Sequence, residues 1–274
     1  DGDGTVLAKD CDDTDVNIYP GATEIWYDGV DQNCDGASDY DQDGDLDVFH
    51  ANLAHPRFID FSNKATLYLN DGGDEPVFKD VNEAMGIRYL ETPSNPNFLD
   101  YDNDGDQDLF FTCTYAGRTS QIYRNDGHPK WKEVSHATGL VIHGGWGSIV
   151  GDIDGDGDLD LLAGSKSFRN RNLTGNGSIT VELEGMGAGG TNRDAIGARV
   201  RTTVKGKLVL RERFSAHGTG VQDSPWIHIG LGDQPAADLT VIFPATGTEI
   251  EIPGVPAGSH IKVHEDGTVI GLAD

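Results

Sequence analysis

The sequence predicts an all-β protein in which three propeller-like blades, forming a partial propeller, are followed by an antiparallel β-sandwich. Three observations lead to this prediction. A nine-residue acidic segment occurs three times, each copy is followed by a short apolar run, and the chain after Gly177 alternates apolar and polar side chains. Frequent glycine, at 37 of the 274 residues, separates the runs.

The acidic residues give the first indication of function. The chain has 46 Asp and Glu against 20 Lys and Arg, a formal net charge of -26. A charge of this sign repels nucleic acid and anionic membranes and attracts cations. Fifteen of the 46 acids fall in three windows, five in each of residues 39–47, 100–108 and 152–160. No apolar stretch is long enough for a membrane span, so we expect none.

The repeat unit extends beyond the acidic window. The segment 39–49 recurs at 100–110 and at 152–162, each time ending in an apolar run. A second element, Leu67–Gly72, matches Ile122–Gly127, and both copies end in Asn-Asp-Gly. That tripeptide between apolar runs is typical of a β-hairpin turn. We therefore expect each unit to contain an acidic loop, a short strand, an aromatic-containing strand and a further short strand. This order is the pattern of a propeller blade.

The spacing of the acids suits Ca²⁺. This hard cation takes about six to eight oxygen ligands, and a short chain supplies them from carboxylates at alternate positions, with glycine at the sharp turn. No Glu stands at the twelfth position, so the loops are not EF-hands. The alternative, a solvated acidic turn without metal, leaves the repulsion within each window unrelieved. The expected ligands are Asp39, Asp41, Asp43, Asp45 and Asp47; Asp100, Asp102, Asp104, Asp106 and Asp108; and Asp152, Asp154, Asp156, Asp158 and Asp160, with the fourth Asp of each loop offering its backbone carbonyl.

Two further groups of acids precede the first window. One repeats the spacing of the loops and would share Asp39 with the first of them, so that this residue bridges two ions. The other has irregular spacing, and solvated surface explains it as well as a metal site does. The first group is Asp31, Asn33, Asp35 and Asp39, and the second is Asp1, Asp3, Asp10 and Asp12. The opening Asp1-Gly-Asp-Gly resembles the middle of an acidic loop, which predicts that further sequence lies upstream.

Three cysteines are present. Cys11 and Cys34 bracket a short acidic segment and predict a disulfide, the alternative being two separate buried thiols. Cys113 ends the apolar run 109–113 and is expected to be a buried strand residue rather than a nucleophile.

The chain after Gly177 predicts a separate domain. Period-two alternation with Gly and Pro between the runs is typical of an antiparallel sandwich. The expected strands are 179–183, 198–204, 208–211, 226–229, 239–243 and 260–264. We divide the chain into an acidic segment with the disulfide at 1–38, calcium-binding repeats at 39–175 and the sandwich at 176–274.

Enzyme motifs are weak or missing. The string Gly185–Gly190 fits a dinucleotide fingerprint, but no long helix is expected after it to hold a pyrophosphate, so a strand connection is favoured. No Gly-x-Ser-x-Gly or His-Glu-x-x-His motif is present. We therefore predict that the chain is not an enzyme.

The repeated segments resemble known families. The acidic loops with their Asn-Asp-Gly strands are similar to the FG-GAP/VCBS repeats of integrin-type β-propellers and bacterial surface proteins. The segment 191–200, with 226–232 and 243–247, resembles the ASPIC/UnbV domain. The Cys11–Asp15 and Asp28–Gly36 segments resemble the MopE-type metal-binding motif, whose copper connection does not suit oxygen-only clusters. These resemblances imply an extracellular or cell-surface bacterial protein of adhesive or structural type.

The functional expectation follows from these points. We expect at least three structural Ca²⁺ ions and, because a family propeller usually has more blades, self-association into a filament or matrix through exposed strand edges. The alternative is a calcium-dependent, lectin-like adhesin module in which Trp146 grips a sugar. A tryptophan packed within a blade is the simpler interpretation of Trp146.

Overall fold

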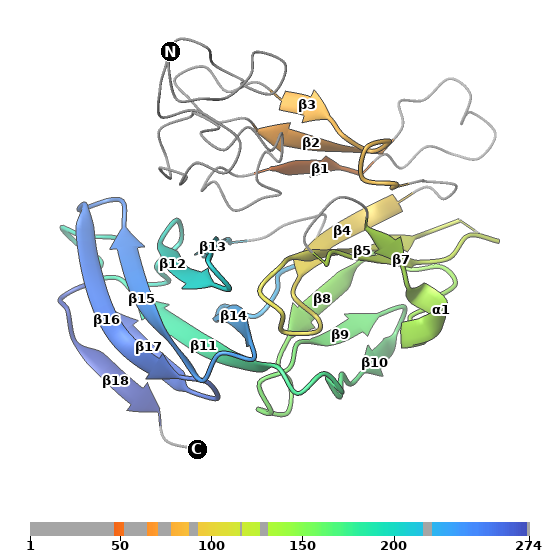
Figure 1. Ribbon diagram of the computed structural model, residues 1–274. Helices are drawn as coiled ribbons and strands as arrows, with labels where there is room; N and C mark the ends of the chain where they lie inside the picture. The colour runs from red at the N-terminus through yellow and green to blue at the C-terminus, as the bar shows by residue number, and fades with distance from the viewer. Residues whose placement is uncertain are drawn as a thin grey trace, which may run out of the picture. The chain divides into compact units, whose positions relative to one another are not determined.

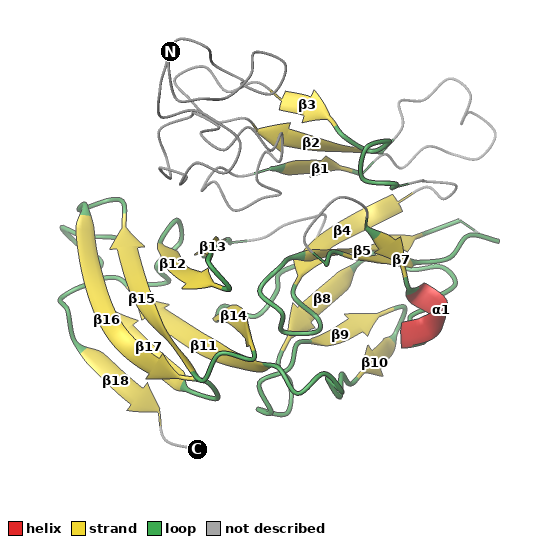
Figure 2. Ribbon diagram, viewed as in Figure 1, coloured by secondary structure: helices red, strands yellow, loops and turns green. Residues whose placement is uncertain are grey.

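The structure is a computed structural model, and it describes residues 47–51, 65–70, 78–87, 93–115, 117–126, 131–215 and 221–272. Over these residues it is almost entirely β, with one short helix, α1 (Ser135–Thr138), so the predicted all-β fold is confirmed (Figures 1 and 2). No described helix is long and apolar enough to cross a membrane. The chain forms two compact units, residues 1–50 with 66–82, and residues 51–65 with 83–274.

The first unit contains one described sheet. It consists of β1 (Val48–His50), β2 (Thr66–Asn70) and β3 (Phe78–Asp80), paired antiparallel in that order. Leu67 and Leu69 of β2 are buried. The backbone N–H of Leu67 donates to Asn82 Oδ1 at 2.9 Å, and its carbonyl accepts from Val81 N at 3.1 Å, so the turn after β3 folds back on the central strand.

The second unit begins with a four-stranded sheet. Its order is β4 (Pro93–Leu99), β5 (Asp108–Cys113), β6 (Gln121–Arg124) and β7 (Lys132–Glu133), all antiparallel. β4 contains Pro93 and Pro96 and lies at the edge, where a missing N–H costs least. Cys113 is buried at the end of β5, as predicted.

A second blade follows directly. β8 (Ser148–Gly151), β9 (Asp160–Ala163) and β10 (Lys166–Phe168) form a three-stranded antiparallel sheet. Leu99, Phe110 and Ile122 of the first sheet share one buried cluster with Val150 and Leu161 of the second. The two blades therefore have a common core.

The structure corrects the predicted start of the blades. The acidic windows 100–108 and 152–160 are the hairpin connections β4–β5 and β8–β9, so a strand of the same sheet precedes each loop. The sequence analysis began each unit at the acidic loop and assigned no strand to Pro93–Leu99 or Ser148–Gly151.

The remaining strands form two four-stranded sheets. One has the order β14 (Ile227–Gly232), β11 (Gly177–Glu184), β17 (His260–His264), β18 (Val269–Leu272); the other has β13 (Lys207–Glu212), β12 (Arg199–Val204), β15 (Ala236–Phe243), β16 (Thr248–Pro256) (Figure 1). All six predicted strands are present, and β16 and β18 were missed. β11 and β17 pair in parallel, so the first of these sheets is mixed, whereas the other strand pairs of the sandwich are antiparallel as predicted.

The two sheets enclose one apolar core. Val181 and Ile229 from one sheet meet Val200, Val241 and Phe243 from the other, and all five are fully buried. Each such side chain stabilises the fold by about 1.5–3 kcal/mol relative to an exposed position. These inward residues alternate with outward polar ones, which is why the period-two pattern located the strands.

The glycine-rich connection 185–190 is held by a buried carboxylate. Glu265, between β17 and β18, is 2% exposed and accepts hydrogen bonds from Met186 N at 2.8 Å, from the backbone and hydroxyl of Thr191, and from Thr246 Oγ1 at 2.7 Å. Burial by itself would raise the pKa of Glu265, but these donors outweigh it and lower the pKa to about 2. The string is thus a strand connection, as predicted.

We predict that Glu265→Gln destabilises the sandwich by about 2 kcal/mol at pH 7, because the amide cannot accept from all of these donors. The folded-state pKa lies below the ordinary glutamate value of 4.5, so the stabilisation by wild-type Glu265 is present above pH 4.5 and disappears as the pH falls toward about 2. Denaturant unfolding of both proteins from pH 7 to pH 2.5 measures this difference. Asp233→Asn, at an exposed carboxylate of the same sandwich, is the control. A wild-type advantage that stays constant with pH contradicts the prediction.

Candidate metal centre

The acidic loop 100–108 is shaped by its first and last carboxylates. Asp100 accepts from Asp104 N at 3.0 Å and from Gly105 N at 2.9 Å. Asp108 accepts from Tyr101 N at 3.1 Å through one oxygen, and from Asn125 N at 2.8 Å through the other. Gly105 has φ of +101°, a conformation that favours glycine. The loop therefore curls around Asp100 and is closed by Asp108.

Loop 152–160 repeats this arrangement. Asp152 accepts from Gly155 N at 2.7 Å and from Gly157 N at 2.9 Å. Asp160 accepts from Ile153 N at 3.0 Å and from Asn170 N at 2.7 Å. Three of the four contacts join equivalent residues in the two loops, and the fourth donor is Asp104 N in one loop and Gly155 N in the other. The geometry is therefore largely a property of the repeat.

In each loop, three carboxylates converge. Oxygen atoms of Asp100, Asp102 and Asp108 all lie within 4.8 Å of one another, and those of Asp152, Asp154 and Asp160 do the same. Two oxygens bound to one Ca²⁺ at about 2.4 Å are at most about 5 Å apart, so both groups are compact enough to share an ion.

The other predicted ligands point elsewhere. Asp104 groups instead with Asp102 and with Asp126, a residue that the sequence analysis did not select. Asp106 lies 3.4 Å from Lys207 Nζ. Asp156 pairs with Arg169, and Asp158 accepts from Asn103 Nδ2 at 2.8 Å and from Asn172. The backbone-carbonyl role of Asp106 and Asp158 stays a prediction.

Asp126 belongs to the repeated Asn-Asp-Gly element, and this repetition is the sequence feature that could have identified Asp126 as a candidate metal ligand. The element was assigned only to a hairpin turn. In the structure Asp126 forms ion pairs with Arg124 at 2.8 Å and with Lys132 at 2.7 Å.

The electrostatics of loop 100–108 are unfavourable without a cation. Asp100 is 2% exposed and Asp108 is 0% exposed. Burial, opposed by Arg211 and reinforced by neighbouring aspartates, raises the pKa of Asp100 to about 7; burial and the charges of Asp100 and Asp102 raise the pKa of Asp108 well above its usual value. Burial likewise raises the pKa of Asp104 to about 6. A divalent cation among these oxygens removes this penalty.

The donor set also fits a metal. Asp102 Oδ1 is buried and has no hydrogen-bond partner, although buried carboxylate oxygens are almost always paired. This oxygen belongs to a residue of the convergent group. Carboxylates without histidine or thiolate suit a hard cation such as Ca²⁺ rather than copper.

The sandwich contacts the backbone of both loops. Gly232 N donates to Asn103 O at 2.7 Å, and Arg211 Nη2 donates to Gly105 O at 2.9 Å. In the other loop, Gly157 O accepts from Ser178 Oγ at 2.5 Å and lies 3.0 Å from His228 Nε2. The loops thus form part of the contact between blades and sandwich within the second unit.

Several predicted metal residues lie outside the described residues, and so do Cys11 and Cys34. Of the first acidic loop, Asp47 alone is described, immediately before β1. The undescribed ones are Asp1, Asp3, Asp10, Asp12, Asp31, Asn33, Asp35, Asp39, Asp41, Asp43 and Asp45.

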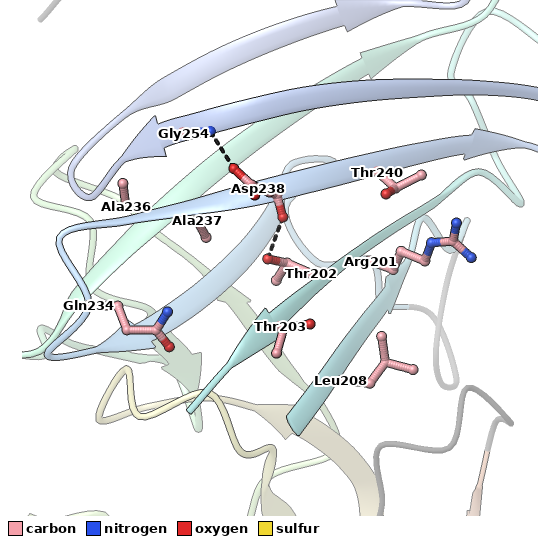
Figure 3. Close-up of a pocket in the computed structure, with 10 residues that line it drawn as sticks. All are labelled: Arg201, Thr202, Thr203, Leu208, Gln234, Ala236, Ala237, Asp238, Thr240 and Gly254. Carbon is pink, nitrogen blue, oxygen red and sulfur yellow. Dashed lines mark hydrogen bonds between the residues drawn. The ribbon is translucent and has the colours of Figure 1, made fainter. Parts of the chain in front are cut away.

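A polar pocket on the sandwich is a weaker candidate site. It has a volume of about 420 Å³ and lies against β12 and β15 (Figure 3). Its polar groups are already engaged: Asp238 accepts from Gly254 N at 2.6 Å and from Thr202 Oγ1 at 2.7 Å, and Gln234 Oε1 accepts from Lys205 N at 2.6 Å. Little hydrogen-bonding capacity is left there for a ligand.

Three family models match the chain in the predicted order. A candidate metal-binding motif, Cu-binding_MopE, matches residues 10–40; an FG-GAP-like repeat matches residues 39–111 and 100–163; and a model described as ASPIC and UnbV matches residues 188–269. The chain carries FG-GAP-like repeats and an ASPIC and UnbV domain. The FG-GAP-like matches span all three acidic windows, and the resemblances described from the sequence are confirmed.

Individual relatives extend this comparison. Cartilage acidic protein 1 of Mus musculus is 28% identical over 228 residues, and that of Homo sapiens is 28% identical over 226 residues. Each match covers 76% of this chain but 33% or 32% of the relative, so the chain spans about a third of the length of these curated proteins. A solved structure described as a candidate cell adhesion protein from Bacteroides uniformis ATCC 8492 covers 78% of this chain and 85% of its own, at 12% identity and a TM-score of 0.25. A score of this size does not establish a shared fold.

We predict that Gly230→Ala separates the sandwich from loop 100–108. A Cβ at this position would lie 2.1 Å from Asp100 Oδ2 and 2.6 Å from the backbone of Asn103. Relief requires a shift of backbone, so we expect a loss of roughly 2–4 kcal/mol in unfolding free energy, measured by denaturant titration. Gly271→Ala in β18, where nothing lies within 4 Å, is the control. Equal stability of the two variants contradicts the close contact.

Proposed function

We propose that this chain is an extracellular, non-catalytic adhesive or structural module whose acidic loops bind Ca²⁺. The similar closure of loops 100–108 and 152–160 around three convergent carboxylates carries this proposal. FG-GAP-like repeats and the candidate metal-binding motif support it. The described residues offer oxygen ligands alone at these groups, which favours Ca²⁺ over copper.

The ion stabilises the fold in this proposal. If each loop binds Ca²⁺ with free ion at about a hundred times its Kd, linkage contributes about 2.7 kcal/mol per site. Two such sites amount to a large part of a typical domain stability of about 5–15 kcal/mol. Extracellular millimolar calcium would keep sites of this kind filled.

Self-association is the finer part of the proposal. The sheet β8–β9–β10 has three strands where the preceding blade has four, so β10 is an edge among the described strands. β18 is the edge of its own sheet and carries the partly exposed Val269 and Ile270. Exposed strand edges favour pairing with another chain, which supports a filament or matrix.

We predict that Asp108→Asn and Asp160→Asn each remove one Ca²⁺ from the binding stoichiometry. Asn keeps the shape but lacks the charge that a hard cation requires. Isothermal titration with CaCl₂ measures the ion count, and thermal unfolding with and without EGTA measures the stabilisation, which should fall by about 2–3 kcal/mol per lost site.

Asp266→Asn serves as the control, because this carboxylate is exposed on the sandwich. Wild-type protein that neither binds Ca²⁺ at millimolar concentration nor changes its unfolding temperature with EGTA contradicts the proposal. Negative-stain images of the same samples test assembly: filaments that fray in EGTA support it, and monodisperse particles in both conditions exclude it.

A calcium-dependent lectin is the second candidate, because Trp146 is 72% exposed rather than packed in the blade. The next residue, Gly147, lines a hollow of about 420 Å³ with Ile149, Leu162 and Val221. An exposed indole beside a hollow is suited to stacking on a sugar.

We predict for this candidate that Trp146→Ala abolishes glycan binding without lowering the unfolding temperature. A glycan array probed with wild type, Trp146→Ala and EGTA-treated protein makes the measurement. Binding that survives the substitution excludes Trp146 as the sugar contact, and an array without any wild-type signal excludes the lectin.

A further inference from the structure

The two described loops differ in the cation that the chain itself places beside them. Loop 152–160 is contacted by Arg169, whose Nε forms an ion pair with Asp154 and whose Nη2 lies 3.2 Å from Asp156. The Arg169 side chain is 62% exposed. An exposed ion pair of this kind contributes little to the free energy of unfolding, and the arginine side chain can rotate into solvent.

Loop 100–108 has a different neighbour. Arg211 reaches it from β13 of the sandwich, and the guanidinium donates to Gly105 O at 2.9 Å and to Leu210 O at 3.0 Å. Arg211 is partly buried, and its forked donors are fixed at both ends. Movement of this side chain away from the loop would break the hydrogen bond to Gly105 O.

The charge of Arg211 lies close to the predicted metal ligands. The guanidinium donates to the carbonyl of Gly105 at 2.9 Å, and the backbone N–H of the same glycine donates to Asp100 Oδ2 at 2.9 Å. One residue therefore links the guanidinium to a carboxylate of the convergent group. A positive charge held this near offsets part of the repulsion among the carboxylates.

We propose that Arg211 is a resident cation of loop 100–108, supplied by the sandwich, which keeps this loop ordered and docked when metal is removed. Loop 152–160, with only an exposed arginine, depends on the added ion. The difference in metal dependence rests on the proposed calcium function, whereas the role of Arg211 in the metal-free protein does not. In this proposal, residues of the blade and of the sandwich surround the metal site at loop 100–108.

The sandwich provides a matched control. Lys207, also on β13, lies 3.4 Å from Asp106 of the same loop, but its side chain is 47% exposed. Lys207→Gln and Arg211→Gln each remove one positive charge from the surroundings of loop 100–108. Burial and the contact with Gly105 distinguish the two positions, so any difference between the variants reports these features rather than net charge.

Hydrogen–deuterium exchange of the full chain, with CaCl₂ and with EGTA, tests the proposal. In wild type we expect EGTA to speed exchange of both loops, and to speed that of loop 152–160 at least about tenfold more than that of loop 100–108. In Arg211→Gln we expect loop 100–108 to lose about one to two orders of magnitude of protection in EGTA. Lys207→Gln should behave as wild type, and peptides from β15 and β16 report whether the sandwich remains folded.

Arg211→Lys separates charge from hydrogen bonding, and carries the test if Arg211→Gln fails to fold. A resident cation predicts that the lysine variant keeps most of the protection in EGTA. Loss of protection equal to that of the glutamine variant overturns the proposal, and so does an Arg211→Gln loop that stays protected in EGTA.

Failure of the calcium function has a different signature. In that case neither loop of the wild type responds to EGTA and titration detects no Ca²⁺ binding. The role of Arg211 is still supported in that case if Arg211→Gln, unlike Lys207→Gln, speeds the exchange of loop 100–108 both in CaCl₂ and in EGTA. A wild-type loop 100–108 that opens in EGTA as readily as loop 152–160 overturns the role of Arg211 while leaving calcium binding intact.

Discussion

The structure depends on how the repeated loops accommodate five carboxylates within nine residues. Backbone amides relieve the first and ninth of them: Asp100 and Asp108 each accept two N–H groups, and Asp152 and Asp160 do the same. Two amide dipoles do not neutralise a buried charge that has like charges beside it. A cation that matches the remaining charge, whether an ion or an arginine, would stabilise this conformation of the loop.

The same contacts explain why two sequence elements repeat together. The ninth aspartate of each loop takes a hydrogen bond from the backbone of Asn125 or Asn170, the residue at the end of the aromatic-containing strand. The loop between the first two strands is thereby tied to the end of the third. An acidic loop without this partner strand would be open on that side.

The sequence predicted what local pattern determines. Alternation located six strands of the sandwich, and the spacing of aspartates located the loops and their convergent first, third and ninth residues. The sequence analysis did not predict β4. Pro93 and Pro96 argue against a strand unless its position at the edge of the sheet is known. The parallel pairing of β11 with β17 was also missed, since strand partners distant in sequence leave no local signal. Our division into three domains stays a prediction.

Arg211 illustrates the same limit for the site. On sequence it is one of several basic residues in an alternating strand, and nothing local connects it to a loop about a hundred positions earlier. Only the tertiary fold brings its guanidinium to Gly105 O, as it brings Gly230 against Asp100 and Ser178 to Gly157 O. These sandwich residues contact loop backbone atoms, whose directions are set by the curl around Asp100 and Asp152. A change in the curl would therefore change the surface that the sandwich contacts. Loop conformation and the contact with the sandwich are then coupled, so a cation that favours the curled loop would also favour this contact.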